Sequence, residues 1–225
     1  MAIQLQSTKG LHSNGVKMLV YGQAGAGKTS LIPTLPNPVV FSAEGGLLSI
    51  ADAEVPFIEV TDMATLYEAY QWVTESDEAK VFESVALDSI SEIAEVVLSA
   101  EKKKTKDPRQ AYGALQDIMG DLIRAFRDIP GKHVYMSAKL EKAQDEQGRI
   151  LYSPSMPGNK LAQSLGFFFD EVFALRVEKG DDGKNIRMLQ CDTDGLWQAK
   201  DRSGKLDPWE MPDLGEIIRK IGGES

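Results

Sequence analysis

The segment GQAGAGKT at residues 22–29 constrains the fold of this chain more tightly than any other part of the sequence. It fits the pattern G-x-x-x-x-G-K-[ST] at every fixed position and adds a further glycine at Gly25. Glycines let the backbone bend so that successive N–H groups point inward at an anion. The apolar run VKMLVYG at residues 16–22 predicts a buried strand before the segment, and residues 29–35 predict a helix after it. Strand, glycine-rich turn and helix together predict a phosphate-binding loop.

The ligand that such a loop holds is the phosphate tail of a nucleotide. We expect the Lys28 ammonium to reach the outer phosphates and the Thr29 hydroxyl to ligate Mg²⁺. A chance match in a glycine-rich turn would not require the flanking strand and helix, and the sequence predicts both. The residues expected to contact the nucleotide are Gly22, Gln23, Ala24, Gly25, Ala26, Gly27, Lys28, Thr29 and Ser30.

Beyond the loop, predicted strands alternate with predicted helices. The strands are residues 38–42, 84–88 and 133–138, and the helices are residues 64–75, 90–104 and 111–127. This alternation is typical of an α/β fold, a mainly parallel sheet with flanking helices. Residues 167–177, 186–191 and 196–200 predict further strands separated by the turn clusters GDDG and DTDG, which we expect to extend the same sheet in antiparallel fashion. We therefore expect a flexible arm over residues 1–15 and a single domain over residues 16–225.

Composition indicates the cellular location of the protein and the kinds of partner to expect. No apolar stretch approaches the roughly 20 residues that cross a membrane, and the first residues lack the apolar centre of a signal peptide. Cys191 is the single cysteine, so no intrachain disulfide can form. We expect a cytoplasmic protein with no membrane partner. A net charge of −9 argues against a broad basic surface for duplex DNA, although a local basic groove can lie on an acidic body.

Two acidic residues follow predicted strands. Asp88 ends the strand SVALD, a position that suits a carboxylate orienting the water shell of Mg²⁺. Glu44 follows the strand PVVFS within FSAEGG, where a carboxylate faces the crevice at the carboxyl ends of parallel strands. There Glu44 is a candidate general base for the water that attacks the γ-phosphate. A solvated loop glutamate is the alternative for Glu44. Ser89 fits a helix cap as well as a hydrogen-bonding role in the site.

The order of phosphate loop, strand–Ala–Glu, strand–Asp and a further strand ending in small polar residues resembles the RecA-like core of P-loop NTPases. The resemblance implies that Glu44 is the catalytic glutamate, with Lys28 and Asp88 acting beside it. It also implies a sensor on the strand at residues 133–138. The family places glutamine or asparagine there, whereas this sequence offers Ser137 or Lys139.

The segment KDRSG at residues 200–204 is similar to the K-x-R-x-G finger that RecA-fold ATPases insert into a neighbour's site. The likeness implies that Lys200 and Arg202 neutralise charge on the γ-phosphate of an adjacent copy, in a ring or a filament. A basic surface turn is the alternative.

Together with PGNKLAQSLGFFFDEV at residues 157–172, the arrangement resembles small phage-encoded RecA-like ATPases of single-strand annealing and recombination. That likeness implies ATP and Mg²⁺ as cofactors, single-stranded DNA as substrate and the host cytoplasm as location. A single-strand-binding protein is a further candidate partner.

Two segments are candidates for contact with DNA. The first holds Lys102, Lys103, Lys104, Lys106 and Arg109, and the second is residues 140–157, expected to be a loop with Lys142, Arg149 and Tyr152. Lysines pair with phosphates, and an aromatic ring offers a stacking face to a base. A solvated helix face is the alternative for the lysine run.

Other classes of P-loop protein fit the sequence less well. A GTPase needs N-K-x-D, and the nearest segment, NKLA at residues 159–162, lacks the acid, which favours adenine. A small-molecule kinase needs a cluster of lid arginines that the sequence does not offer. A clamp loader or unfoldase needs a helical C-terminal lid, whereas this C-terminus is predicted to be rich in strands. A nucleotide-gated binding module with little turnover, or another helicase-like motor, remains open.

Overall fold

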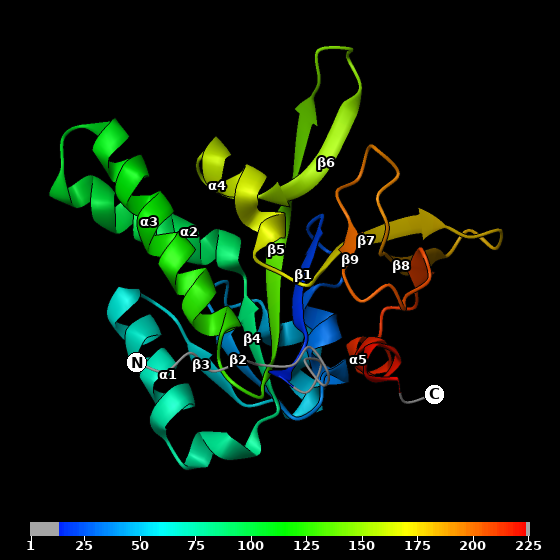
Figure 1. Ribbon diagram of the computed structural model, residues 1–225, viewed down its shortest axis with the longest axis horizontal. Coiled ribbons are helices and arrows are strands. Elements are labelled where there is room, and N and C mark those ends of the chain that lie inside the picture. The colour runs from blue at the N-terminus through cyan, green and yellow to red at the C-terminus, as the bar shows by residue number, and fades with distance from the viewer. Residues whose placement is uncertain (1–13, 224–225) are drawn as a thin grey trace, which may run out of the picture.

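The computed structural model describes residues 14–223, so residues 1–13 of the predicted arm lie outside the described part (Figure 1). Its centre is a ten-stranded sheet with the order β10-β8-β7-β1-β5-β4-β2-β3, in which β6 pairs with β5 and β9 pairs with β7. The parallel strands are β1 (Lys17–Gly22), β2 (Pro38–Ser42), β3 (Phe57–Glu59), β4 (Ser84–Asp88), β5 (His133–Gln144) and β7 (Glu171–Lys179). The antiparallel strands are β6 (Ile150–Ser155), β8 (Asn185–Gln190), β9 (Lys200–Asp201) and β10 (Trp209–Glu210). The predicted mainly parallel sheet is confirmed, but the antiparallel extension begins only at β8, because β7 pairs with β1 in parallel.

Helices flank the sheet. They are α1 (Met63–Glu75), α2 (Ile90–Lys104), α3 (Pro108–Arg127), α4 (Asn159–Ser164) and α5 (Leu214–Gly222). Short polar side chains start four of them: Asp62, Ser89, Asp107 and Asp213 accept a hydrogen bond from a backbone N–H of the first turn of α1, α2, α3 and α5, respectively. Within residues 14–223, no helix is both long and apolar enough to cross a bilayer.

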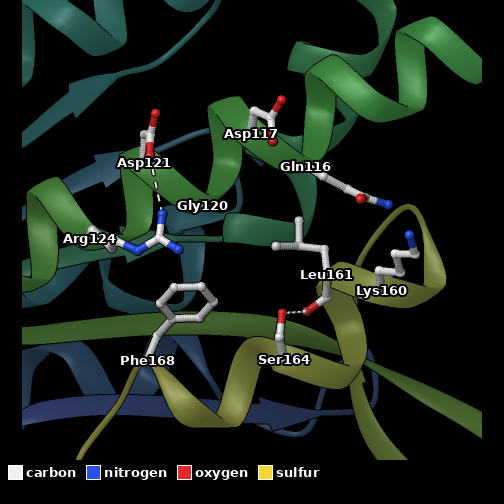
Figure 2. A pocket seen from close by; sticks show the side chains of 9 residues that line it. All are labelled: Gln116, Asp117, Gly120, Asp121, Arg124, Lys160, Leu161, Ser164 and Phe168. Atoms are coloured by element: carbon white, nitrogen blue, oxygen red, sulfur yellow. Dashed lines mark hydrogen bonds and ion pairs between the residues drawn. The ribbon is translucent and has the colours of Figure 1, made fainter.

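A pocket of about 270 Å³ lies between α3 and α4 (Figure 2). Its lining carries charges of both signs, and the Arg124 guanidinium lies 5.1 Å from the centre of the Phe168 ring. The lining residues are Gln116, Asp117, Gly120, Asp121, Arg124, Lys160, Leu161, Ser164 and Phe168. None of them belongs to the predicted phosphate loop.

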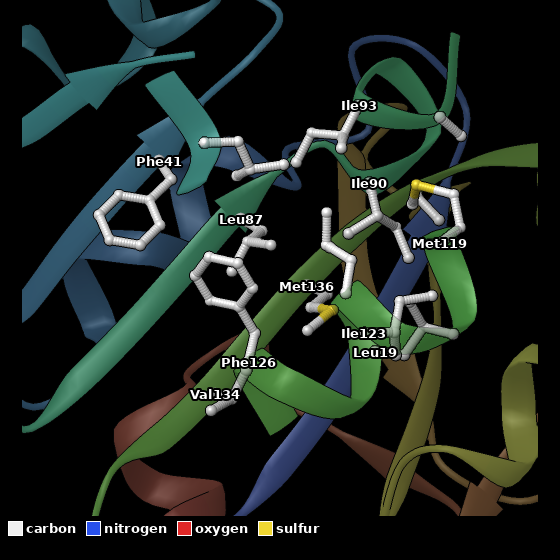
Figure 3. Packing of buried hydrophobic residues seen from close by; sticks show 14 of the residues in the cluster. Leu19, Phe41, Leu87, Ile90, Ile93, Met119, Ile123, Phe126, Val134 and Met136 are labelled. Atoms are coloured by element: carbon white, nitrogen blue, oxygen red, sulfur yellow. The ribbon is translucent and has the colours of Figure 1, made fainter. Parts of the chain in front are cut away.

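Two apolar cores cover the two faces of the sheet. On one face α2 and α3 pack against the central strands, with Phe126 of α3 near Leu87 of β4 and Met136 of β5 (Figure 3). On the other face, Phe173 of β7 packs with Ile32 and with Ile217 of α5. Because β1, β4 and residues 134–138 of β5 are largely apolar on both faces, they are buried at the centre of the sheet.

The segment after the loop forms a 3₁₀ helix, η2 (Thr29–Thr34), rather than an α-helix. Pro33 lies inside it, and a proline there has no N–H to donate to the carbonyl four residues earlier. The tighter 3₁₀ pattern is used instead, with hydrogen bonds such as Leu35 N–H to the Ile32 carbonyl at 3.1 Å.

Three other expectations are corrected. Residues 140–157 were expected to form a loop, but β5 continues to Gln144 and pairs with β6 in a hairpin that projects beyond the sheet (Figure 1). The strand expected at residues 167–177 begins only at Glu171, because the 3₁₀ helix η5 (Leu165–Phe167) precedes it, and the strand expected at 196–200 is reduced to β9. The C-terminal part contains the strands β7, β8, β9 and β10, as predicted, but it ends in the helix α5, which was not predicted although the spacing of Leu214, Ile217 and Ile221 is helical.

Candidate functional site

The loop at residues 22–29 leaves the carboxyl end of β1 in a conformation that needs glycine. Gly25 and Gly27 have φ values of +74° and +105°, which side chains strongly disfavour. Gly22 needs close approach instead, since a Cβ there would lie 2.9 Å from the Leu175 carbonyl oxygen of β7. These three glycines let the chain turn tightly against β7.

Lys28 folds back across the loop. Its ammonium donates to the carbonyl oxygens of Gly22 at 3.0 Å and Gln23 at 3.1 Å. Partial burial lowers the pKa of Lys28, while the negative charges of Glu44 and Asp88 oppose that shift. The cation is thus held at the mouth of the loop by groups that a phosphate oxygen can replace.

Thr29 and Asp88, 59 residues apart, meet at the carboxyl edge of the sheet. The Thr29 hydroxyl donates to Asp88 Oδ2 at 2.8 Å, and the buried Ser137 hydroxyl of β5 donates to Asp88 Oδ1. Burial raises the pKa of Asp88, and the two hydroxyl hydrogen bonds act in the opposite direction. A hydroxyl and a carboxylate are oxygen ligands of the kind that Mg²⁺ takes in phosphate sites.

This oxygen pair fits Mg²⁺ only together with a phosphate ligand. Within residues 14–223 there is no group of three His, Cys, Asp or Glu side chains that could hold a metal alone. Mg²⁺ commonly uses one or two protein oxygens and completes its shell with water and substrate phosphates. The residues present fit that mode of binding.

Glu44 lies beside this pair on the next strand end. β2 and β4 are in register at Ser42 and Asp88, so the chain after β2 emerges next to Asp88. Glu44 is exposed, and its Oε1 accepts a hydrogen bond of 2.6 Å from the Ser89 hydroxyl. The same hydroxyl accepts from the Glu92 N–H at 3.3 Å. Ser89 is therefore both the cap of α2 and a partner of Glu44.

The two sensor candidates have different surroundings. Ser137 is buried and bonded to Asp88, as described above. Lys139 is exposed, and its ammonium pairs with Glu92 at 2.6 Å. The structure thus brings Ser137 into contact with a predicted metal ligand and Lys139 into contact with the first turn of α2.

Lys200 and Arg202 lie away from the loop of their own chain. In the sheet, Lys200 is paired with Val172 of β7. Val172 comes three residues before Leu175, whose carbonyl oxygen lies close to Gly22 at the start of the loop. Its ammonium turns further away and donates to the carbonyls of Gly166 at 2.7 Å and Phe169 at 2.5 Å. Arg202 pairs with Asp170 at 2.8 Å. Action of both residues across an interface stays a prediction.

A stack of cationic and aromatic side chains joins the β5–β6 hairpin to the C-terminal strands. The Tyr152 ring lies 4.0 Å from the Trp197 ring at 9°, and Lys142 lies 5.6 Å from the Tyr152 ring. Arg176 lies between Trp197 and Trp209, at 4.8 Å and 5.0 Å from the two rings. Trp197 therefore contacts both an aromatic ring and a guanidinium of its own chain.

The two segments predicted to contact DNA are placed as follows. Arg149 pairs with Asp145 in the hairpin turn at 2.7 Å. In the other segment, Lys102 lies 5.6 Å from the Tyr112 ring. Sequence reasoning missed Arg176 and Trp197, because no local motif relates two residues that meet only through β7 and the segment before β9.

A family model described as an AAA domain matches residues 14–203. The matched segment contains the loop, Glu44, Asp88 and the KDRSG segment. A search of curated proteins found no match.

Proposed function

The chain belongs to the AAA-domain family of P-loop ATPase-like proteins, and from this premise we propose that residues 22–29 bind ATP with Mg²⁺ and that the protein hydrolyses it. The observation that carries the proposal is the meeting of Lys28, Thr29 and Asp88 at the mouth of a glycine-rich loop. A half-buried ammonium beside a hydroxyl–carboxylate pair offers counter-charge and metal ligands at one place. Nucleotide-binding ATPase activity is the function that the family supports.

In the proposed reaction the loop residues hold the phosphates while Glu44 acts on water. Backbone N–H groups and the Lys28 ammonium bind the phosphate oxygens, and Thr29 and Asp88 hold the metal. Mg²⁺, when bound, neutralises phosphate charge and acts as a Lewis acid. Glu44 takes a proton from the attacking water as the new oxygen–phosphorus bond forms. The bond from the γ-phosphorus to the bridging oxygen breaks, which leaves ADP and inorganic phosphate.

Ser89 supports Glu44 in this role. Its hydroxyl, 2.6 Å from Glu44 Oε1, restricts the orientation of an otherwise exposed carboxylate. Because Ser89 also begins α2, the carboxylate is tied to a rigid element rather than to the glycine-containing segment that follows it.

The finer part of the proposal is a RecA-like protein that acts on single-stranded DNA in phage recombination or strand annealing. It is supported by the lysine-rich end of α2 and by the projecting β5–β6 hairpin, which carries Lys142 and Arg149. Adjacent copies in a ring or filament would bring Lys200 and Arg202 to the neighbouring loop.

A nucleotide-gated module with little turnover is the second candidate. One observation favours it: Lys200 and Arg202 are bonded to groups of their own chain and lie away from their own loop. In a single copy, neither cation is available to neutralise charge on the γ-phosphate.

The test measures MgATP binding and hydrolysis with single-stranded DNA, double-stranded DNA and no DNA. We expect Lys28→Ala to lose nucleotide binding, and Glu44→Gln to keep binding while hydrolysis falls. Glu78→Gln, at an exposed position of the 3₁₀ helix η4 (Glu78–Val81), is the matched control and should behave as the parent chain. Undiminished hydrolysis by Glu44→Gln would remove Glu44 from the mechanism. Equal turnover with and without any DNA would refute the DNA-dependent part.

A mixing experiment tests the interface. Arg202→Ala should lose turnover alone and regain part of it when mixed with Lys28→Ala, because each variant supplies what the other lacks. Absence of rescue in mixed assemblies would show that Arg202 does not act across an interface.

A further inference from the structure

Arg187 of β8 reaches the phosphate loop from a distant part of the sequence. Its Nε donates to the Ala26 carbonyl oxygen at 2.9 Å, across 161 residues. Nε also lies 3.3 Å from the position that a Cβ on Gly27 would occupy. β8 brings Arg187 there because it pairs with β7, which pairs with β1, the strand from which the loop emerges.

The hydrogen bond fixes the direction of one peptide group in the loop. A peptide unit is planar and trans, so its C=O and its N–H point in nearly opposite directions. The Ala26 carbonyl and the Gly27 N–H belong to the same unit. Because the carbonyl faces Arg187, the Gly27 N–H faces away from β8.

A hydrogen bond from outside the loop restrains this peptide group, whose flanking glycines do little to restrain it themselves. Gly25 and Gly27 flank Ala26, and both have positive φ, in a region where glycine moves freely. Two neighbouring backbone groups are already held: the Ala26 N–H donates to the Gln23 carbonyl at 3.2 Å, and the Tyr135 hydroxyl donates to the Lys28 carbonyl at 2.8 Å. The peptide between Ala26 and Gly27 is held by Arg187.

We infer that Arg187 is a positioning residue of the phosphate loop, which holds the Ala26–Gly27 peptide with its N–H toward the bound phosphates. The inference rests on the proposed nucleotide binding at residues 22–29. Arg187 acts through the peptide, so its effect belongs to phosphate binding and not to recognition of the base. Arg187 also lies away from Asp88, the proposed metal ligand at the end of β4, because β8 and β4 lie on opposite sides of β1 in the sheet.

Two substitutions separate this role from direct contact with the ligand. In Arg187→Gln, the amide nitrogen takes the place of Nε, which keeps the donor and removes the charge. Arg187→Met keeps a similar length without a donor. Lys184→Met is the matched control, since Lys184 is exposed on the same hairpin and pairs with Asp182 at 3.3 Å.

Affinity is measured for MgATP and for inorganic tripolyphosphate, with a thermal melt of each variant. We expect Arg187→Met to weaken the binding of both ligands about tenfold, the loss of one hydrogen bond, without a matching fall in melting temperature. Arg187→Gln should stay close to the parent chain for both ligands, as should Lys184→Met.

Two results would overturn the inference. Equal losses in Arg187→Gln and Arg187→Met would show that the guanidinium charge acts on the ligand directly. A loss for ATP but not for tripolyphosphate would show a contact with the base or ribose.

Amide hydrogen exchange in the ligand-free protein tests the same idea independently. Exchange at residues 25–28 should be faster in Arg187→Met than in Arg187→Gln, and equal rates would contradict a tether. A failure of the proposed function looks different, because the parent chain would then bind neither ligand, or Lys28→Ala would bind both as tightly.

Discussion

Replacing Glu171 by glutamine should change how the stability of the protein depends on pH. Glu171 begins β7, is 1% exposed, and its Oε2 has no hydrogen-bond partner among residues 14–223. Burial raises the pKa of Glu171 from 4.5 to about 8, and the nearby charge of Asp201 adds to the effect. The folded protein therefore keeps this carboxyl protonated at pH values where the unfolded chain ionises it.

The sign and the size follow from proton linkage. Between pH 4.5 and about 8 the folded state binds one more proton than the unfolded state, so this group lowers the unfolding free energy as pH rises. Each unit of pKa difference corresponds to about 1.4 kcal/mol, so the move from 4.5 to about 8 sets a ceiling of roughly 5 kcal/mol. Glutamine is neutral in both states and removes this pH-dependent loss.

Urea denaturation at about pH 5 and about pH 8.5 measures the effect. The quantity compared is the unfolding free energy of Glu171→Gln minus that of the parent chain. We expect this difference to be larger at about pH 8.5 than at about pH 5 by at least about 2 kcal/mol. The matched control is Glu68→Gln, an exposed position on α1, which should show no such change. Parallel pH curves for Glu171→Gln and the parent chain would refute the argument, because they would mean that the buried carboxyl ionises normally.

Three further predictions concern the core, the loop support and the KDRSG segment. Phe126→Ala removes a buried ring packed edge-on against two aromatic neighbours and should cost about 3–5 kcal/mol of unfolding free energy in urea. Tyr135→Phe removes the donor to the Lys28 carbonyl and should cost about 1 kcal/mol and weaken MgATP binding measured by calorimetry. Lys200→Met leaves two carbonyls without their donor and should lower the unfolding free energy in urea by about 1–3 kcal/mol. The MgATP affinity of the isolated chain should not change. Unchanged stability would show that these hydrogen bonds contribute nothing.

Features that depend on contiguous residues could be predicted from the sequence alone. The phosphate loop is defined by glycine spacing and by the apolar strand before it, so residues 22–29 could be assigned without any tertiary information. Asp88 and Glu44 could be predicted from the sequence for a related reason. Asp88 ends one apolar strand and Glu44 follows another, and the carboxyl ends of neighbouring parallel strands meet at one edge of a sheet.

Local sequence patterns also gave wrong secondary-structure predictions, for the β5–β6 hairpin and for η2. The β5–β6 hairpin was not predicted, and β6 contains Pro154, a residue that normally argues against a strand. At Pro154 the strand lies outside the main path of the sheet, where a missing N–H is tolerated. The 3₁₀ form of η2 depends on Pro33, whose effect on hydrogen bonding could have been anticipated from the sequence.

The distant residues that support the loop could be identified only from the folded chain. Arg187 reaches Ala26, and Ser137 reaches Asp88, because the sheet places β7 and β8 on one side of β1, and β5 and β4 on the other. The same order leaves Lys200 away from its own loop. Strand order is set by long-range packing of both sheet faces, which no short window of sequence contains, whereas the bend of a glycine-rich turn is a property of its own backbone.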